Sequence, residues 1–211
     1  MLSVVFGIFK MLKSLLLLTF KKKLVFWKFQ NTKIPIKIPI MNKIIFLDID
    51  GVLNPQHYMN CLHKMWKASS TEIKSQDDFG DLFFQHNCDA LQMIVDATGA
   101  DIVISSTWRL AGGMKMKELW MNRKLAGKII GITPTEVEVV KSGKAEFYDA
   151  VCRGMEIAHW IDTNNFKGNY VIIDDTEDML QLQEPFFVKT NSWVGLTFKD
   201  AKKAIEILGV K

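Results

Sequence analysis

Two aspartates, Asp48 and Asp50, are the side chains in this 211-residue sequence that are best arranged for chemistry. They follow residues 43–47, K-I-I-F-L, a short apolar run typical of a buried strand in a parallel sheet. Alternation along a strand places both carboxylates on one side. Neighbouring carboxylates repel each other and are costly to desolvate, and a hard cation such as Mg2+ relieves both effects. An isolated pair could equally start a turn before Gly51, so the rest of the chain must supply partners.

A second acidic pair ends another apolar run. Asp174 and Asp175 follow residues 169–173, N-Y-V-I-I, and Asp178 comes three residues later. Because the carboxyl ends of parallel strands meet at one edge of a sheet, the two acidic pairs are expected to lie together there. The sequence therefore predicts a cation site built across neighbouring strands. It leaves open which of Asp174, Asp175 and Asp178 contacts the ion directly.

Hydroxyl and guanidinium groups follow a third apolar run. Residues 101–104 are D-I-V-I, and the chain continues through Ser105 and Ser106 to Arg109 in S-S-T-W-R. Hydroxyls beside the free amides of a loop suit a phosphate oxygen, and a guanidinium can grip a phosphate with two hydrogen bonds. The alternative is a loop that caps the next helix, with Arg109 on its surface. Taken alone, the segment fits both interpretations.

These segments belong to an alternating pattern of strands and helices. Further strands are expected over 128–134 and 186–190, and helices over 87–98, 114–125, 153–161 and 197–208, with Asn87 and Thr197 as N-caps. Such alternation is typical of an α/β protein with a central parallel sheet. Residues from about 55 to 84 are polar and are expected to form an irregular flap or small cap over the acidic pair.

The charge of the chain is unevenly distributed. Residues 1–40 contain eight lysines and no acid, so a formal net charge of +4 for the whole chain leaves about −4 for residues 41–211. Bulk charge therefore implies no stable binding of nucleic acid by the second part. Three cysteines without C-x-x-C spacing argue against zinc and favour a reducing, cytoplasmic location.

Residues 1–40 form a basic, apolar extension that is open to two interpretations. Its longest lysine-free apolar stretches are too short for an uninterrupted membrane-spanning helix, and it has no signal-peptide cleavage pattern. It could lie in a membrane interface through its lysines and Trp27. Alternatively, Met41 is the true start and residues 1–40 are mis-called upstream sequence, which would leave 41–211 as the hydrolase domain.

The motifs in their order resemble those of the haloacid dehalogenase (HAD) superfamily. The pieces F-L-D-I-D-G-V-L-N, S-S-T-W-R, R-G-M-E-I-A-H-W-I and V-I-I-D-D are similar to the HAD domain of Swiss Army Knife RNA repair proteins. This resemblance implies a Rossmann-like three-layer sandwich with a small cap insertion. It also adds Arg153, which opens the helix upstream of the second acidic pair, as a phosphate-binding residue.

The resemblance further implies a Mg2+-dependent phosphatase. Asp48 would be the nucleophile that forms an aspartyl-phosphate and Asp50 the general acid and base. Ser105, or Ser106 in its place, would bind the phosphate together with Arg153, and the metal would be held by Asp48, the backbone carbonyl of Asp50, and Asp174 with or without Asp175. The expected substrate is a phosphorylated compound, with a nucleic-acid end as the first hypothesis. The alternatives are a small-molecule or nucleotide phosphatase and a non-catalytic phosphate-binding module.

Overall fold

The computed structural model describes residues 42–68 and 76–209. The chain divides after residue 40 into two units, and every described residue belongs to the second. The interpretations of residues 1–40 therefore lie outside the described residues. None of the helices within the described ranges combines the length and the apolar composition needed to cross a bilayer.

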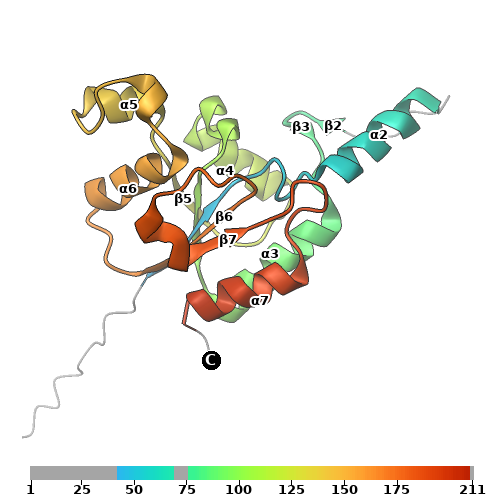
Figure 1. The fold of residues 1–211 in the computed structure, drawn as a ribbon. Coiled ribbons are helices and arrows are strands. Elements are labelled where there is room, and N and C mark those ends of the chain that lie inside the picture. The colour runs from blue at the N-terminus through green and yellow to red at the C-terminus, as the bar shows by residue number, and fades with distance from the viewer. Residues whose placement is uncertain (1–41, 69–75, 210–211) are drawn as a thin grey trace, which may run out of the picture. The chain divides into compact units, whose positions relative to one another are not determined.

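A five-stranded sheet forms the centre of this unit (Figure 1). Its order is β5-β4-β1-β6-β7, and every neighbouring pair is parallel. The strands are β1 (Lys43–Leu47), β4 (Asp101–Ile104), β5 (Ile129–Ile132), β6 (Asn169–Asp174) and β7 (Phe187–Lys189). The first apolar run of the sequence thus becomes the central strand, with the runs that precede the serines and the second acidic pair on either side. The predicted parallel sheet is confirmed.

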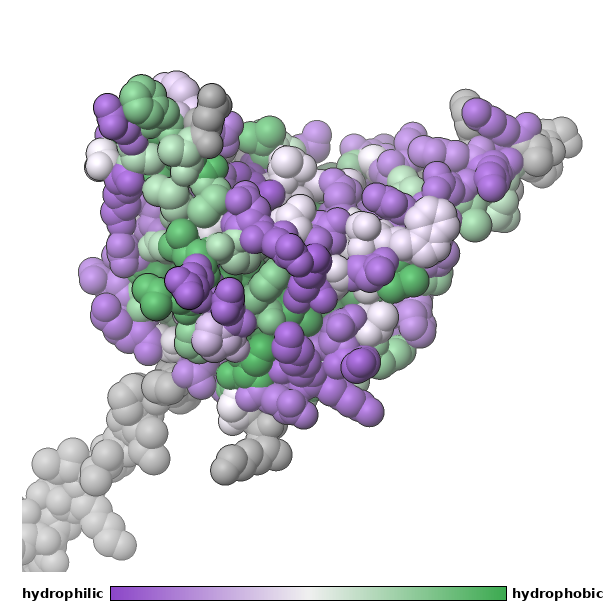
Figure 2. All heavy atoms as spheres, viewed as in Figure 1, coloured by the Kyte–Doolittle hydropathy of each residue, from purple (hydrophilic) through white to green (hydrophobic). Residues whose placement is uncertain are grey.

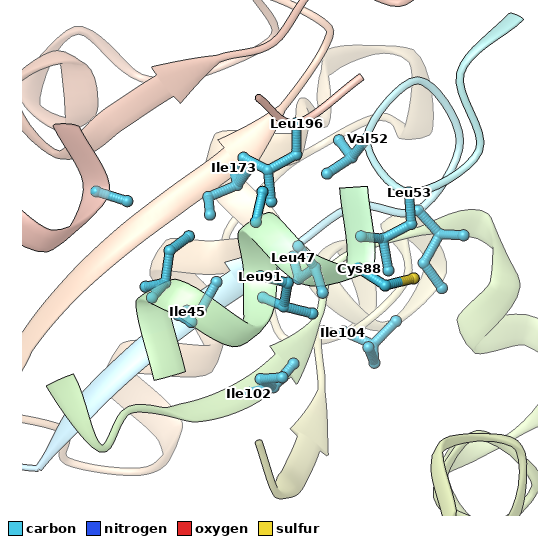
Figure 3. Packing of buried hydrophobic residues seen from close by; sticks show 14 of the residues in the cluster. Ile45, Leu47, Val52, Leu53, Cys88, Leu91, Ile102, Ile104, Ile173 and Leu196 are labelled. Carbon is cyan, nitrogen blue, oxygen red and sulfur yellow. The ribbon is translucent and has the colours of Figure 1, made fainter. Parts of the chain in front are cut away.

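Alternation along β1 sends its side chains into two separate cores. Ile45 and Leu47 belong to the larger core (Figure 3), in which the sheet packs against helices α3 (Gln85–Thr98), α4 (Gly113–Asn122) and α7 (Phe198–Ile207). Ile44 and Phe46 belong to the smaller core, on the side of α6 (Arg153–Thr163). A short helix, α5 (Glu136–Lys141), packs beside α6. Helices on both faces of the sheet confirm the predicted three-layer, Rossmann-like architecture.

The ends of two helices test the capping predictions. Thr197 caps α7 as predicted, since its hydroxyl and the Asp200 carboxylate form a reciprocal capping box. The prediction of Asn87 as the cap of α3 is wrong, because that helix begins at Gln85. The buried Asn87 amide instead donates to the carbonyls of Val194 and Leu196, at 3.0 and 2.8 Å. It therefore ties α3 to the loop that precedes α7.

The segment from 55 to 84 differs from the irregular flap that was expected. It contains the 13-residue helix α2 (Gln56–Ala68) and a hairpin of β2 (Gln76–Asp77) and β3 (Gly80–Asp81). Arg123, the C-cap of α4, holds this hairpin by donating to both carboxylate oxygens of Asp77, at 2.9 and 2.7 Å. The signal for α2 in the sequence is an apolar stripe of Tyr58, Leu62 and Met65 at spacings of four and three residues, which the polar residues between them obscured.

Candidate active site

Three carboxylates meet at the carboxyl edge of the sheet. Asp48 directly follows β1, Asp174 ends β6, and Asp175 comes next. The parallel register pairs Leu47 with Ile173, and the Asp48 amide donates to the Ile173 carbonyl at 3.0 Å. One ligand oxygen from each of the three aspartates lies within 4.8 Å of the others. The register of two neighbouring strands thus assembles the acidic cluster.

Burial and mutual repulsion change the proton affinity of this cluster. Burial, followed by the charge of Asp174, raises the pKa of Asp48 to about 7, although Ser106 and Arg153 oppose the rise. Burial also raises the pKa of Asp174, against hydrogen bonds from the Thr176 amide and hydroxyl at 2.9 and 2.7 Å. The pKa of the half-buried Asp175 is raised for the same first reason. Without a cation, the cluster favours holding a proton.

The donor set of the cluster fits a hard divalent cation. Asp174 is 1% exposed, and its Oδ2 atom is buried without a hydrogen-bond partner among the described residues. Its nearest opposite charge is Arg153, whose Nε lies 3.7 Å away. Carboxylate oxygens that converge without enough donors are the ligands that Mg2+ prefers. Asp48, Asp174 and Asp175 are therefore the residues that could hold the metal, whereas the Asp50 carboxylate lies outside this cluster of three.

A tight turn brings Asp50 beside the cluster. Gly51 has a φ of +70°, and a Cβ atom at this position would lie 2.3 Å from Asp175 Oδ2, so only glycine fits. The exposed Asp50 carboxylate accepts a hydrogen bond from Trp108 Nε1 at 3.0 Å. Trp108 in turn packs edge-on against Phe83, with ring centroids 5.4 Å apart. The indole therefore fixes an otherwise free carboxylate next to the acidic cluster.

The two serines after β4 have different surroundings. The Ser105 amide donates to the Leu47 carbonyl at 2.8 Å, and its buried hydroxyl has no hydrogen-bond partner among the described residues. The Ser106 side chain lowers the pKa of the Asp48 carboxyl. Ser106 also precedes the 3-10 helix η1 (Thr107–Ala111) as its N-cap. Ser106 thus influences the Asp48 carboxyl, and the Ser105 hydroxyl is left free to donate.

A buried carboxylate joins the two predicted arginines. Glu156 accepts from Arg109 Nη2 at 2.6 Å and from Arg153 Nη1 at 3.3 Å, and the carboxylate is 7% exposed. Burial raises the pKa of Glu156, although both guanidinium groups oppose the rise. Arg153 lines the cavity above the acidic cluster, whereas Arg109 is not among the lining residues. Glu156 was not predicted from the sequence, where its only signal is its position three residues after Arg153 on a helix.

Asp178 has a role apart from the acidic cluster. Its carboxylate accepts a hydrogen bond from the Arg153 amide at 3.0 Å, and its carbonyl accepts from the Gly154 amide at 2.9 Å. These bonds satisfy amides at the first turn of α6. Asp178 thereby fixes the start of the helix that carries Arg153.

An open cavity of about 550 Å³ is lined by four of the residues predicted for the site. Its lining includes Asp48, Asp50, Asp175 and Arg153. The other lining residues come from the turn after β1, from helix α2 and from the start of η1: Gly51, Asn54, Gln56, Met59, Asn60, His63 and Thr107. The contribution of α2 to the cavity was not predicted from the sequence. A cavity of this size admits a ligand as large as a nucleotide.

One comparison with known proteins gave a match. A family model described as the HAD domain in Swiss Army Knife RNA repair proteins matches residues 44–201. This range includes every residue of the acidic cluster and all of the cavity lining. No curated protein and no solved structure matches the chain.

Proposed function

Because the chain belongs to the family of HAD domains in Swiss Army Knife RNA repair proteins, we propose that it is a Mg2+-dependent phosphatase that removes terminal phosphates from nucleic acid. The family supports phosphohydrolase activity in general. The observation that carries the finer proposal is the convergence of Asp48, Asp174 and Asp175 within 4.8 Å. Two of these residues, Asp48 and Asp175, also line one open cavity together with Asp50 and Arg153. Several carboxylates would repel a bound phosphate, so they are not expected in a site that only binds phosphate.

The first chemical step is a displacement at phosphorus by Asp48. A bond forms between a carboxylate oxygen and phosphorus while the bond from phosphorus to the ester oxygen breaks. Asp50 gives its proton to the departing oxygen, and the Trp108 indole holds Asp50 in place for this transfer. The products of this step are an aspartyl-phosphate and a free hydroxyl on the substrate.

The second step returns the enzyme to its starting state. Asp50 accepts a proton from a water molecule, which attacks the phosphorus of the aspartyl-phosphate. The bond to Asp48 breaks, and inorganic phosphate leaves. In both steps Arg153 and a serine hydroxyl donate to the phosphoryl oxygens, and donors already oriented toward developing charge supply much of the catalysis. Arg109 acts on the phosphate indirectly, because it shares Glu156 with Arg153.

The metal would be held by Asp48, Asp174 and Asp175. When bound, Mg2+ neutralises the carboxylates and polarises a phosphoryl oxygen, which lets an anionic nucleophile approach an anionic phosphate.

The test is phosphate release by the full-length chain, with Mg2+ or with EDTA. The substrates are an aryl phosphate, mononucleotides and oligonucleotides phosphorylated at the 3′ or the 5′ end. We expect Asp48→Asn to lower turnover by at least 1,000-fold with the fold intact, and the exposed Asp162→Asn on α6 to retain full activity. Full activity of Asp48→Asn would refute the proposed mechanism.

A second candidate function is hydrolysis of small phosphate esters or mononucleotides. The cavity of about 550 Å³ favours it, because a mononucleotide would fit within this volume. Release from small esters but not from oligonucleotide ends would identify this activity. A folded protein that releases no phosphate from any substrate would instead be a phosphate-binding module.

A further inference from the structure

Helix α2 presents one continuous face to the cavity. Four lining residues come from this helix, namely Gln56, Met59, Asn60 and His63. Their spacings of three, four and seven residues place them on the same side of a helix. One wall of the cavity is therefore a helix face, and it supplies a carboxamide, a second carboxamide and an imidazole to whatever lies there.

The same face continues past the cavity and becomes basic. Lys64 and Lys67 lie four and seven residues after Asn60, and Lys67 is also four residues after His63. Both lysines are exposed. The sequence has no aspartate or glutamate between Val52 and Thr71, so no acid of α2 neutralises them. A polar, then basic stripe thus leads away from the acidic cluster.

The dimensions of this stripe suit a chain of phosphates. At a rise of about 1.5 Å per residue, Asn60 and Lys67 are roughly 10 Å apart along the helix axis. One strand of a duplex carries a phosphate about every 3.4 Å along its axis, so this length corresponds to at most about three phosphates, and to fewer where a single strand is extended. Figure 1 shows α2 extending outward from the end of β1, and Figure 2 shows a mostly hydrophilic surface over it. The stripe is accessible to a ligand longer than the cavity.

We propose that this face of α2 binds the sugar–phosphate backbone of a single-stranded nucleic acid whose terminal phosphate lies at Asp48. The inference rests on the proposed function. Lys64 and Lys67 attract the phosphates a few nucleotides from the end, while Asn60 and His63 contact the first nucleotides. A mononucleotide reaches the cavity but not the two lysines. The helix therefore selects long substrates, although residues 41–211 as a whole have an acidic formal charge.

The test compares two pairs of charge reversals in the full-length chain. Lys64→Glu with Lys67→Glu reverses the basic end of the stripe. Lys199→Glu with Lys202→Glu is the matched control, because these lysines are also exposed, three residues apart and on a helix, and α7 does not line the cavity. The substrates are a hexanucleotide with a terminal phosphate and the corresponding mononucleotide.

The expected result is a loss of preference for the longer substrate. The α2 variant should lower the ratio of kcat/KM for the hexanucleotide to that for the mononucleotide by at least fivefold, and the control should not. The slope of log kcat/KM for the hexanucleotide against log salt should weaken by about 1.4, since each single-strand phosphate contact contributes about 0.7. An unchanged ratio, an unchanged slope or an equal effect of the control would overturn the proposal.

A separate measurement keeps this inference apart from the proposed chemistry. If the unmodified chain releases no phosphate from either substrate, the proposed phosphatase activity fails. Binding of a fluorescently labelled hexanucleotide, followed by anisotropy, then tests α2 with the same variants. Tighter binding by the control than by the α2 variant supports the strand-binding face, and equal binding or no binding by the unmodified chain rejects it.

Discussion

Replacing Glu156 with glutamine should both destabilise the fold and weaken catalysis. The carboxylate is 7% exposed and accepts from two guanidinium groups, Arg109 at 2.6 Å and Arg153 at 3.3 Å. Glutamine offers one acceptor oxygen and turns an NH2 donor toward the second guanidinium. Arg109, whose side chain is 6% exposed and whose Nε and Nη1 already lack partners among the described residues, would then carry an uncompensated charge.

The magnitude follows from the cost of an unpaired buried charge. Removing one partner of a buried ion pair costs about 3–5 kcal/mol, and the oxygen that glutamine retains recovers part of it, so we expect a loss of roughly 2–4 kcal/mol in the free energy of unfolding. Arg153 would lose the group that orients it, and kcat/KM should fall by about 10–100-fold, with most of the fall in kcat.

Urea unfolding followed by circular dichroism measures the stability, and phosphate release measures the activity. Asp162→Asn serves as the control, because Asp162 lies on the same helix as Glu156 and its ion pair with Lys144 is exposed. This variant should leave both the stability and the activity almost unchanged. A second background, Arg109→Met, removes the buried charge, so the stability cost of Glu156→Gln should shrink in it. A Glu156→Gln variant that matches the unmodified protein in both assays would refute this account of the arginine pair.

Three further predictions concern the acidic cluster and the turn beside it. Because the pKa of Asp48 is about 7 in the folded chain and 3.8 ordinarily, the folded state holds a proton that the unfolded state has released between these values. The free energy of unfolding of the EDTA-treated protein should therefore fall by up to about 4 kcal/mol as pH rises from 4 to 7. Urea unfolding should show a flatter dependence of this free energy on pH for Asp48→Asn or with saturating Mg2+. Trp108→Phe keeps the packing but removes the donor to Asp50, so steady-state kinetics should show kcat reduced about tenfold, and an unchanged kcat would deny the indole this role. Gly51→Ala strains the backbone and places a Cβ atom against Asp175. Calorimetric titration should therefore show the affinity for Mg2+ lowered at least tenfold, and an unchanged affinity would contradict this account of the turn.

The central strand and the acidic pairs could be predicted from the sequence because each rests on local information. An apolar run followed by Asp48, or by Asp174, indicates a buried strand and its polar end within a few residues of sequence. The parallel register then brings the two ends together, and this step needs only the general rule for α/β sheets. The fold class also rests on a local pattern, the alternation of strands and helices along the chain, and the structure confirms it.

Other features depend on contacts between distant segments, which local patterns do not record. Glu156 looks like an ordinary surface glutamate until the fold brings Arg109 to it from 47 residues away. Asn87 looks like a helix cap, but Val194 and Leu196 supply carbonyls that its amide satisfies in the interior. Helix α2 carries an apolar stripe at Tyr58, Leu62 and Met65, so its existence could have been inferred from periodicity, whereas its place beside the cavity depends on the fold.

The position of β1 at the middle of the sheet has a consequence for biosynthesis. Both of its neighbours, β4 and β6, come later in the chain. At about 5–20 residues per second, a ribosome needs roughly 6–25 s to pass from Asp48 to Asp175. Throughout that interval the nascent chain carries an apolar strand with at least one unpaired edge, which is a template for aggregation. Slow translation between these two aspartates should therefore lower the soluble yield, and chaperones that shield apolar segments should raise it.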